Sequence, residues 1–157
     1  MAFKKSRTTA SVAADKKVIV DGTWAIDPLI SQDDIFACAQ HALLGATTSA
    51  AQALQHSIPQ VPAAAHKPVS TGSKSGITWA TWHHGKDFYT YWCGDVMAIL
   101  QSASLTDTER ETALLRARKA GAQGARVFAT GAKLTHKAPQ APESGIEHIG
   151  LVFTRNT

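Results

Sequence analysis

Apolar and polar positions along the chain change period several times, and each change predicts a new element. Short runs rich in β-branched and aromatic residues predict strands. These runs lie at residues 17–20, 24–26, near 67–70, 77–82, 87–92, 126–130 and 146–155. The turn signal Asp21-Gly22-Thr23 separates the first two runs and predicts a hairpin, and a second hairpin is predicted across residues 83–86.

Four helices are predicted from apolar residues that recur three and four positions apart. They are expected over residues 31–45, from 47 or 48 to 58, 94–103, and from 106 to 121 or 124. Ser31 and Thr106 are each followed three positions later by an acidic residue, a spacing that predicts an N-cap and favours a capping box. The first two helices are joined by only a few residues, so we expect them to form an antiparallel pair.

The order of these elements predicts the fold class. A strand pair is followed by a helix pair, a hairpin, a second helix pair and two further strands. Strands and helices are therefore segregated, which favours an α+β domain over alternating βαβ units. We expect an antiparallel β-sheet flanked by two helical hairpins over residues 17–157. Residues 1–16 lack periodicity and are expected to form a flexible basic N-terminal segment.

Composition and charge narrow the class of protein. The chain has 157 residues, a net charge of +4, a pI of about 9.2 and a mean hydropathy of -0.12. These values are typical of one globular domain. No apolar run approaches the roughly 20 residues that span a bilayer, and the first ten residues lack the apolar core of a secretory signal, so a cytosolic setting is expected. The basic N-terminal segment is a weak indication of binding to nucleic acid or to an anionic membrane, and such a segment is more often only a solvated end.

The cysteines and the paired histidines offer little chemistry of their own. Cys38 and Cys93 are far apart and form no CxxC motif, so they are expected to be reduced thiols. Cys93 has no histidine beside it in a recognisable dyad and is expected to be inert rather than nucleophilic. His83 and His84 lack a third metal ligand nearby in sequence and are expected to lie in a solvated loop.

The stretch of residues 89–100 is the strongest candidate for a binding site. It reads as a strand as far as Trp92 and as a helix after Gly94. A glycine at such a corner allows a ligand to approach the backbone closely, and the helix that follows directs its free N–H groups toward the corner. The alternative is an ordinary junction between a strand and a helix, with no ligand.

Three segments of this chain resemble the nucleotide-binding domain of P-type cation-transporting ATPases. Residues 91–100 (YWCGDVMAIL) resemble the family's lysine–glycine segment and the helix that follows it. Residues 121–129 (GAQGARVFA) resemble its GxRVLA segment, and residues 146–152 (IEHIGLV) resemble its LxxLGLV strand. The resemblance extends from about Lys17 to Phe153.

The resemblance implies that the domain binds ATP. In the family, adenine stacks on a phenylalanine and lies beside the lysine of the lysine–glycine motif, while an arginine reaches the phosphates or the domain contact. The matching glycine is Gly94 and the matching arginine is Arg126, and Lys74 stands where the family has a basic residue ahead of the hairpin. The lysine position holds Cys93, and the phenylalanine position holds Val69.

The same resemblance implies partners and a location. The expected function is an ATP-binding domain that presents nucleotide to a phosphorylation domain, with that domain and an actuator domain as partners. The chain has no Asp-Lys-Thr-Gly-Thr motif, so it is not expected to be catalytic alone, and Mg²⁺ is expected only with the missing phosphorylation domain. The expected location is the cytoplasmic side of a membrane protein, in a domain that does not itself contact the membrane and ends at a domain boundary.

Two other function classes stay open on the sequence. Cys93, Val69 and the absence of an acidic residue around Ala51 remove three of the family's adenine contacts. The fold could therefore have lost ATP binding and serve as an interaction or regulatory module. A small nucleic-acid-binding protein has only the charge and the basic segment in its favour, so nucleic acid is not expected as a partner.

Overall fold

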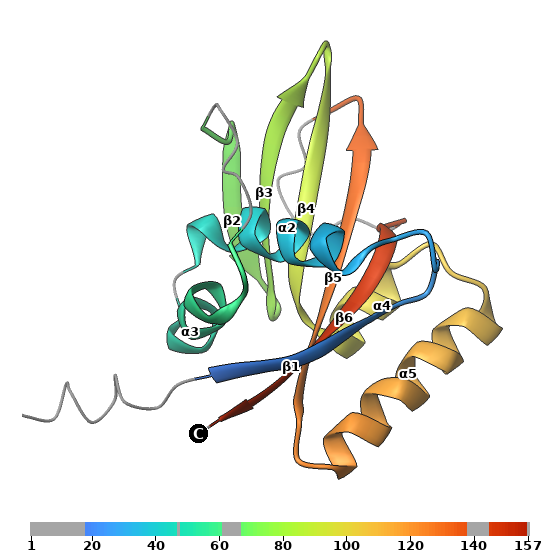
Figure 1. Ribbon diagram of the computed structural model, residues 1–157. Coiled ribbons are helices and arrows are strands. Elements are labelled where there is room, and N and C mark those ends of the chain that lie inside the picture. The colour runs from blue at the N-terminus through green and yellow to red at the C-terminus, as the bar shows by residue number, and fades with distance from the viewer. Residues whose placement is uncertain (1–17, 47, 61–66, 138–144, 157) are drawn as a thin grey trace, which may run out of the picture.

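The computed structural model describes residues 18–46, 48–60, 67–137 and 145–156. Its centre is a six-stranded sheet with the order β1-β6-β5-β4-β3-β2, in which every neighbouring pair is antiparallel (Figure 1). The strands are β1 (Val18–Ala25), β2 (Ser70–Lys74), β3 (Ile77–His84), β4 (Asp87–Asp95), β5 (Arg126–Thr135) and β6 (Glu147–Asn156). The first and last strands of the chain are therefore neighbours.

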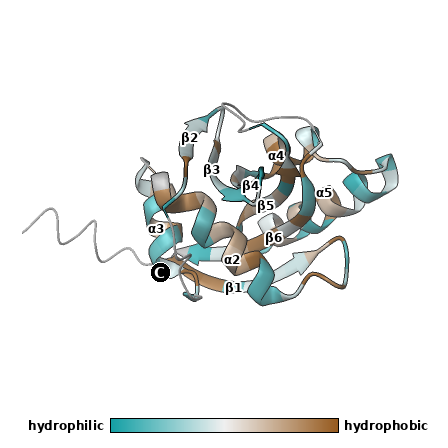
Figure 2. Ribbon diagram, turned by 90° about the horizontal axis from the view of Figure 1, so that it is seen from above, coloured by the Kyte–Doolittle hydropathy of each residue, from teal (hydrophilic) through white to brown (hydrophobic). Residues whose placement is uncertain are grey.

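Helices cover both faces of this sheet. They are α2 (Gln32–Ala42), the 3₁₀ turn η1 (Leu43–Gly45), α3 (Ser49–Ser57), α4 (Val96–Ser102) and α5 (Asp107–Ala122). Seen from above in Figure 2, α2 and α3 lie on one side of the sheet and α4 and α5 on the other. The α+β class with an antiparallel sheet is confirmed.

Strand alternation divides the core into two clusters. Trp92 is fully buried in a cluster with residues of α4 and α5, whereas the neighbouring Cys93 is buried among residues of α2 and α3. Trp79 and Trp82 are likewise on opposite faces of β3, as the alternation predicts. Trp79 joins the α4 cluster, and Trp82 packs edge-on against His41 and Tyr91.

The helix starts agree with the predictions from sequence. Ser31 and Thr106 form capping boxes with Asp34 and Glu109, in which each side chain accepts from the other residue's backbone N–H. Thr48 caps α3 by accepting from the Ala51 backbone N–H at 3.2 Å. These caps satisfy N–H groups that have no partner inside a helix.

The predicted N-terminal hairpin is wrong. Residues 18–25 form one continuous strand, and its partner is β6 rather than a neighbouring segment. The supposed turn is a β-bulge at Asp21, where the register with β6 shifts between Val20 and Gly22. A bulge accommodates one extra residue without reversing the chain, and the Asp21 carboxylate pairs with Arg155 on β6.

Two further elements differ from the prediction. The helix α3 packs against β1 and η1, so the expected antiparallel contact between α2 and α3 is largely replaced by contact with the sheet. The strand near residue 70 lies at Ser70–Lys74 and turns into β3 through Ser75 and Gly76, both with positive φ. Two residues with positive φ are typical of a tight hairpin turn. The expected flexible segment 1–16 lies outside the described residues.

Candidate functional site

A cavity of about 340 Å³ lies between α3 and the sheet, at the end of β4 where the resemblance places the nucleotide. Its helical wall comes from η1 and the first turns of α3, and its sheet wall comes from four strands or their turns. The side chains of Leu43 and Leu54 give the helical wall an apolar surface. Polar groups converge on the opposite wall, namely Ser73, Thr78, Asp95 and Arg126.

Register in the sheet brings the end of β4 beside the start of β5. Gly94 is opposite Ala129, and Asp95 is opposite Phe128. Arg126 lies two residues before Phe128 and therefore on the same face of β5. The guanidinium carbon of Arg126 lies 5.2 Å from the centre of the Phe128 ring. The cavity thus contains a planar apolar ring with a positive charge over it.

The Arg126 side chain is exposed, and its guanidinium makes no hydrogen bond or ion pair with any residue that the structure describes. The backbone is fixed instead, because the Arg126 carbonyl accepts from the Thr154 hydroxyl at 3.1 Å. A fixed backbone with an uncommitted guanidinium suits recognition of an oxyanion, since the planar fork can donate two hydrogen bonds at once.

The first turn of α3 faces the same cavity. Thr48, Ala50 and Ala51 line it, and the N–H groups of a first turn carry the positive end of the helix dipole. Ala51 is the position around which the sequence lacks the family's acidic residue, so no carboxylate from α3 opposes an anion here. The only carboxylate among the described lining residues is that of Asp95, which caps α4 by accepting from the Ala98 N–H at 3.0 Å.

Gly94 is required by the fold whether or not a ligand binds. A Cβ atom at this position would overlap the Gly76 carbonyl oxygen and would lie 2.9 Å from Ile77 Cα. The Asp95 N–H donates to the same Gly76 carbonyl at 2.9 Å. The turn before β3 therefore crosses so close to β4 that no side chain fits between them.

Cys93 contributes an uncharged wall. Its thiol is buried, and burial raises its pKa well above the ordinary value. The thiol is therefore protonated at neutral pH and cannot replace the positive charge of the family's lysine. Both cysteines are free, as predicted.

The structure brings three of the five predicted site residues together. Cys93, Gly94 and Arg126 line the cavity, whereas Val69 and Lys74 do not. Val69 lies just before β2 with its side chain exposed. Lys74 is opposite Ile77 in the hairpin, so alternation directs it to the face of the sheet that carries α4.

Sequence reasoning missed Phe128 and Thr78 as lining residues. Phe128 could have been found from its spacing, because residues two apart on a strand share a face and Arg126 was already a candidate. Thr78 is buried in the sheet and shares a hydrogen bond of 3.3 Å with the Ser73 hydroxyl. Its contribution depends on the pairing of β2 with β3, which no local pattern reveals.

The described residues offer no metal site. Among the described residues, no group of three or more His, Cys, Asp or Glu side chains is arranged to hold a metal ion. The expected loop position of His83 and His84 is wrong: they are the last two residues of β3, and their rings pack beside Phe88 and Tyr89. No helix in the described ranges is long and apolar enough to cross a membrane.

No family model matches this chain, and no curated protein matches it significantly.

Proposed function

We propose that this chain is an ATP-binding domain of the kind found in P-type cation-transporting ATPases. The observation that carries the proposal is the meeting of Cys93, Gly94 and Arg126 in one cavity. Gly94 was selected by the strand-to-helix pattern and by the resemblance, and Cys93 and Arg126 by the resemblance; they come from two strands separated in sequence by two helices. The cavity volume of about 340 Å³ is within the range of small-molecule sites.

The lining residues suggest how the nucleotide lies. Adenine stacks on the Phe128 ring, which takes the role of the phenylalanine that Val69 replaces. The phosphates extend toward the Arg126 guanidinium and the first turn of α3. Ser73 and Thr78 offer hydroxyl groups to the ribose or to the edge of the base.

The proposed role is to bind and present nucleotide rather than to hydrolyse it. Phosphoryl transfer in this family needs an aspartate and Mg²⁺ ligands in a phosphorylation domain, and this chain carries no such motif. The proposed partners are therefore the phosphorylation and actuator domains of a pump, on the cytoplasmic side of a membrane.

A second candidate function is an interaction or regulatory module that has kept the fold and lost the nucleotide. The observation in its favour is the uncharged, buried thiol of Cys93 at the lysine position, together with Val69 outside the cavity. The pocket then lacks both the charge and the stacking ring that the family supplies at those positions.

A titration of the full chain with ATP, monitored through the amide NMR shifts of the protein, distinguishes the two functions. AMP and tripolyphosphate serve as controls for the base and the phosphates. We expect saturable shifts that cluster on residues 73–78, 93–95 and 126–128. If millimolar ATP causes no clustered shift there, nucleotide binding is wrong and the interaction module is the better explanation.

A further inference from the structure

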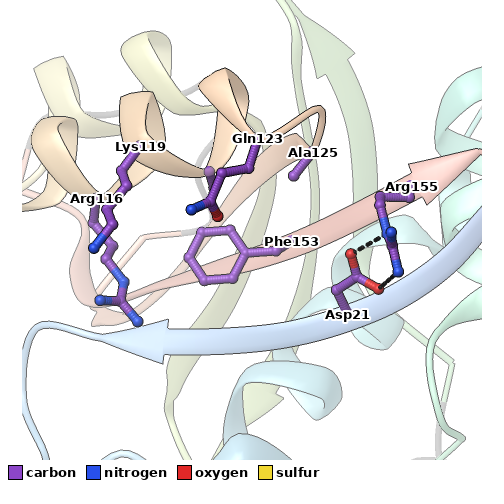
Figure 3. A pocket seen from close by; sticks show the side chains of 8 residues that line it. Asp21, Arg116, Lys119, Gln123, Ala125, Phe153 and Arg155 are labelled. Atoms are coloured by element: carbon purple, nitrogen blue, oxygen red, sulfur yellow. Dashed lines mark hydrogen bonds and ion pairs between the residues drawn. The ribbon is translucent and has the colours of Figure 1, made fainter.

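A second cavity lies on the opposite face of the sheet, under the C-terminal half of α5. Its volume is about 470 Å³, larger than that of the candidate nucleotide pocket. Figure 3 shows the Phe153 ring in the middle, with Arg116 and Lys119 on one side of it and the Asp21–Arg155 pair on the other. The cavity is therefore lined by one aromatic ring, three basic side chains and one acidic side chain.

The sequence of α5 explains why this space is open. Arg116, Lys119, Ala120 and Gln123 recur three and four positions apart and share one face of the helix. A helix that packs tightly on a sheet places large apolar residues on that face. Here the small side chain of Ala120 and the long polar side chains beside it leave the space over Phe153 unfilled.

The two basic side chains that α5 contributes to this cavity, Arg116 and Lys119, form no ion pair with a described residue. The positions three and four residues away from Arg116 and Lys119 carry no acidic residue, and neither side chain forms an ion pair or hydrogen bond within the described ranges. Two like charges three positions apart repel each other. A bound anion would remove that repulsion.

Arg155 is held in place by the bulge in β1. Its Nε atom lies 2.6 Å from one Asp21 carboxylate oxygen, and its Nη2 atom lies 3.1 Å from the other. This bidentate contact uses two of the five N–H donors of the guanidinium and leaves the others for a ligand. Asp21, the extra residue of the bulge, thus acts as a positioning residue for Arg155.

From this arrangement we propose that the α5 cavity is a binding site for a small oxyanion ligand with an aromatic body. The aromatic part lies on Phe153, and a phosphate or carboxylate group accepts hydrogen bonds from Arg116, Lys119 and Arg155. Aromatic rings stack on one another, and basic side chains hold oxyanions with charge-assisted hydrogen bonds. The site is independent of the nucleotide pocket, because the sheet separates the two.

Amide NMR of the full chain tests this site with phenyl phosphate, benzoate and inorganic phosphate as probes. We expect saturable shifts at residues 116–125 and 153–155 with phenyl phosphate. Benzoate shows whether a carboxylate is accepted as well as a phosphate, and inorganic phosphate shows what the ring adds. Shifts confined to residues 126–128 and 73–78 would belong to the nucleotide pocket and would overturn this proposal.

Matched variants test the role of each group. The double variant Arg116→Gln/Lys119→Gln should weaken phenyl phosphate binding by about tenfold or more, because two charged donors are lost. Arg118→Gln removes one positive charge from an exposed position of α5 that does not line the cavity and should have little effect. Phe153→Leu should reduce the preference for phenyl phosphate over inorganic phosphate. Equal weakening by Arg118→Gln, or no saturable shift in the unmodified chain, would overturn the proposal.

Discussion

The guanidinium of Arg126 stacks over the Phe128 ring at 5.2 Å, on the face of β5 that borders the candidate nucleotide pocket. A flat apolar surface and an exposed positive charge therefore lie close enough for one ligand to contact both. A nucleotide needs both, because its base stacks and its phosphates require donors. Because the Arg126 guanidinium already lies over the Phe128 ring, an adenine base must either share that ring with the guanidinium or displace the guanidinium from it.

Removing the charge tests the phosphate contact. Arg126→Ala should weaken ATP binding by roughly tenfold or more, since a hydrogen bond to a charged group contributes about 1.5–3 kcal/mol. AMP should be affected less than ATP, because it has fewer phosphates to contact. Calorimetry or amide shifts would measure both affinities. Arg118→Ala is the control, and an equal loss there would indicate a diffuse electrostatic effect instead.

Removing the ring tests the stack. Phe128→Leu keeps an apolar side chain at this half-buried position and should leave the fold intact. It should weaken the binding of ATP and AMP alike, by about 1–3 kcal/mol, if the base lies on the ring. Tripolyphosphate has no base, so its binding should be unchanged. A variant that binds ATP as tightly as the unmodified chain would remove Phe128 from the site.

The sequence predicts those elements whose causes are local. Ser31 and Thr106 cap helices through residues three positions away, and the alternation over residues 77–92 places Trp79 and Trp82 on opposite faces. Helix capping and strand alternation both depend on residues only a few positions apart in the sequence. The pairing of β1 with β6 joins residues more than a hundred positions apart, and nothing within residues 18–25 distinguishes the Asp21 bulge from a turn.

The candidate site likewise depends partly on local sequence and partly on long-range strand pairing. The resemblance selected Cys93, Gly94 and Arg126, but their proximity depends on the register of β4 with β5, which sets Asp95 opposite Phe128. The resemblance also selected Val69 and Lys74, but the position and direction of β2 decide where these two residues lie. Tertiary register is a property of the whole sheet, so periodicity in one strand cannot supply it.

Gly94 provides a test of the backbone crossing. Gly94→Ala should lower the free energy of unfolding by about 1–3 kcal/mol, because the added methyl group would overlap the Gly76 carbonyl. Gly121→Ala is the matched control. A Cβ atom there meets nothing within 4 Å, and alanine favours a helix over glycine by up to about 1 kcal/mol, so this variant should be slightly more stable. Urea unfolding measures both. If Gly94→Ala is as stable as the unmodified chain, the crossing has more room than the structure indicates.

The buried thiols make stability sensitive to alkaline pH. Burial raises the pKa of the Cys38 thiol from 9.0 to about 12. Burial likewise raises the pKa of the Tyr91 hydroxyl to about 12. The pKa of Cys93 is also raised by burial. Between the ordinary and the raised pKa values, the unfolded chain holds fewer protons than the folded chain, so the free energy of unfolding falls as pH rises.

The free energy of unfolding should therefore begin to fall near pH 9, which is the ordinary pKa of the Cys38 thiol once the unfolded chain exposes it. It should continue to fall toward pH 12, the pKa of the buried thiol. Each such group contributes a slope of at most about 1.4 kcal/mol per pH unit. Cys38→Ser removes one of them, because a serine hydroxyl does not titrate in this range, and can still donate to the Gly131 carbonyl that Cys38 Sγ contacts at 2.9 Å. The measurement is the free energy of unfolding in urea at several pH values from 8 upward, compared between the two proteins. A shallower slope for Cys38→Ser is expected whatever its stability at pH 8, whereas identical slopes would mean that the Cys38 thiol ionises as easily in the folded chain as in the unfolded one.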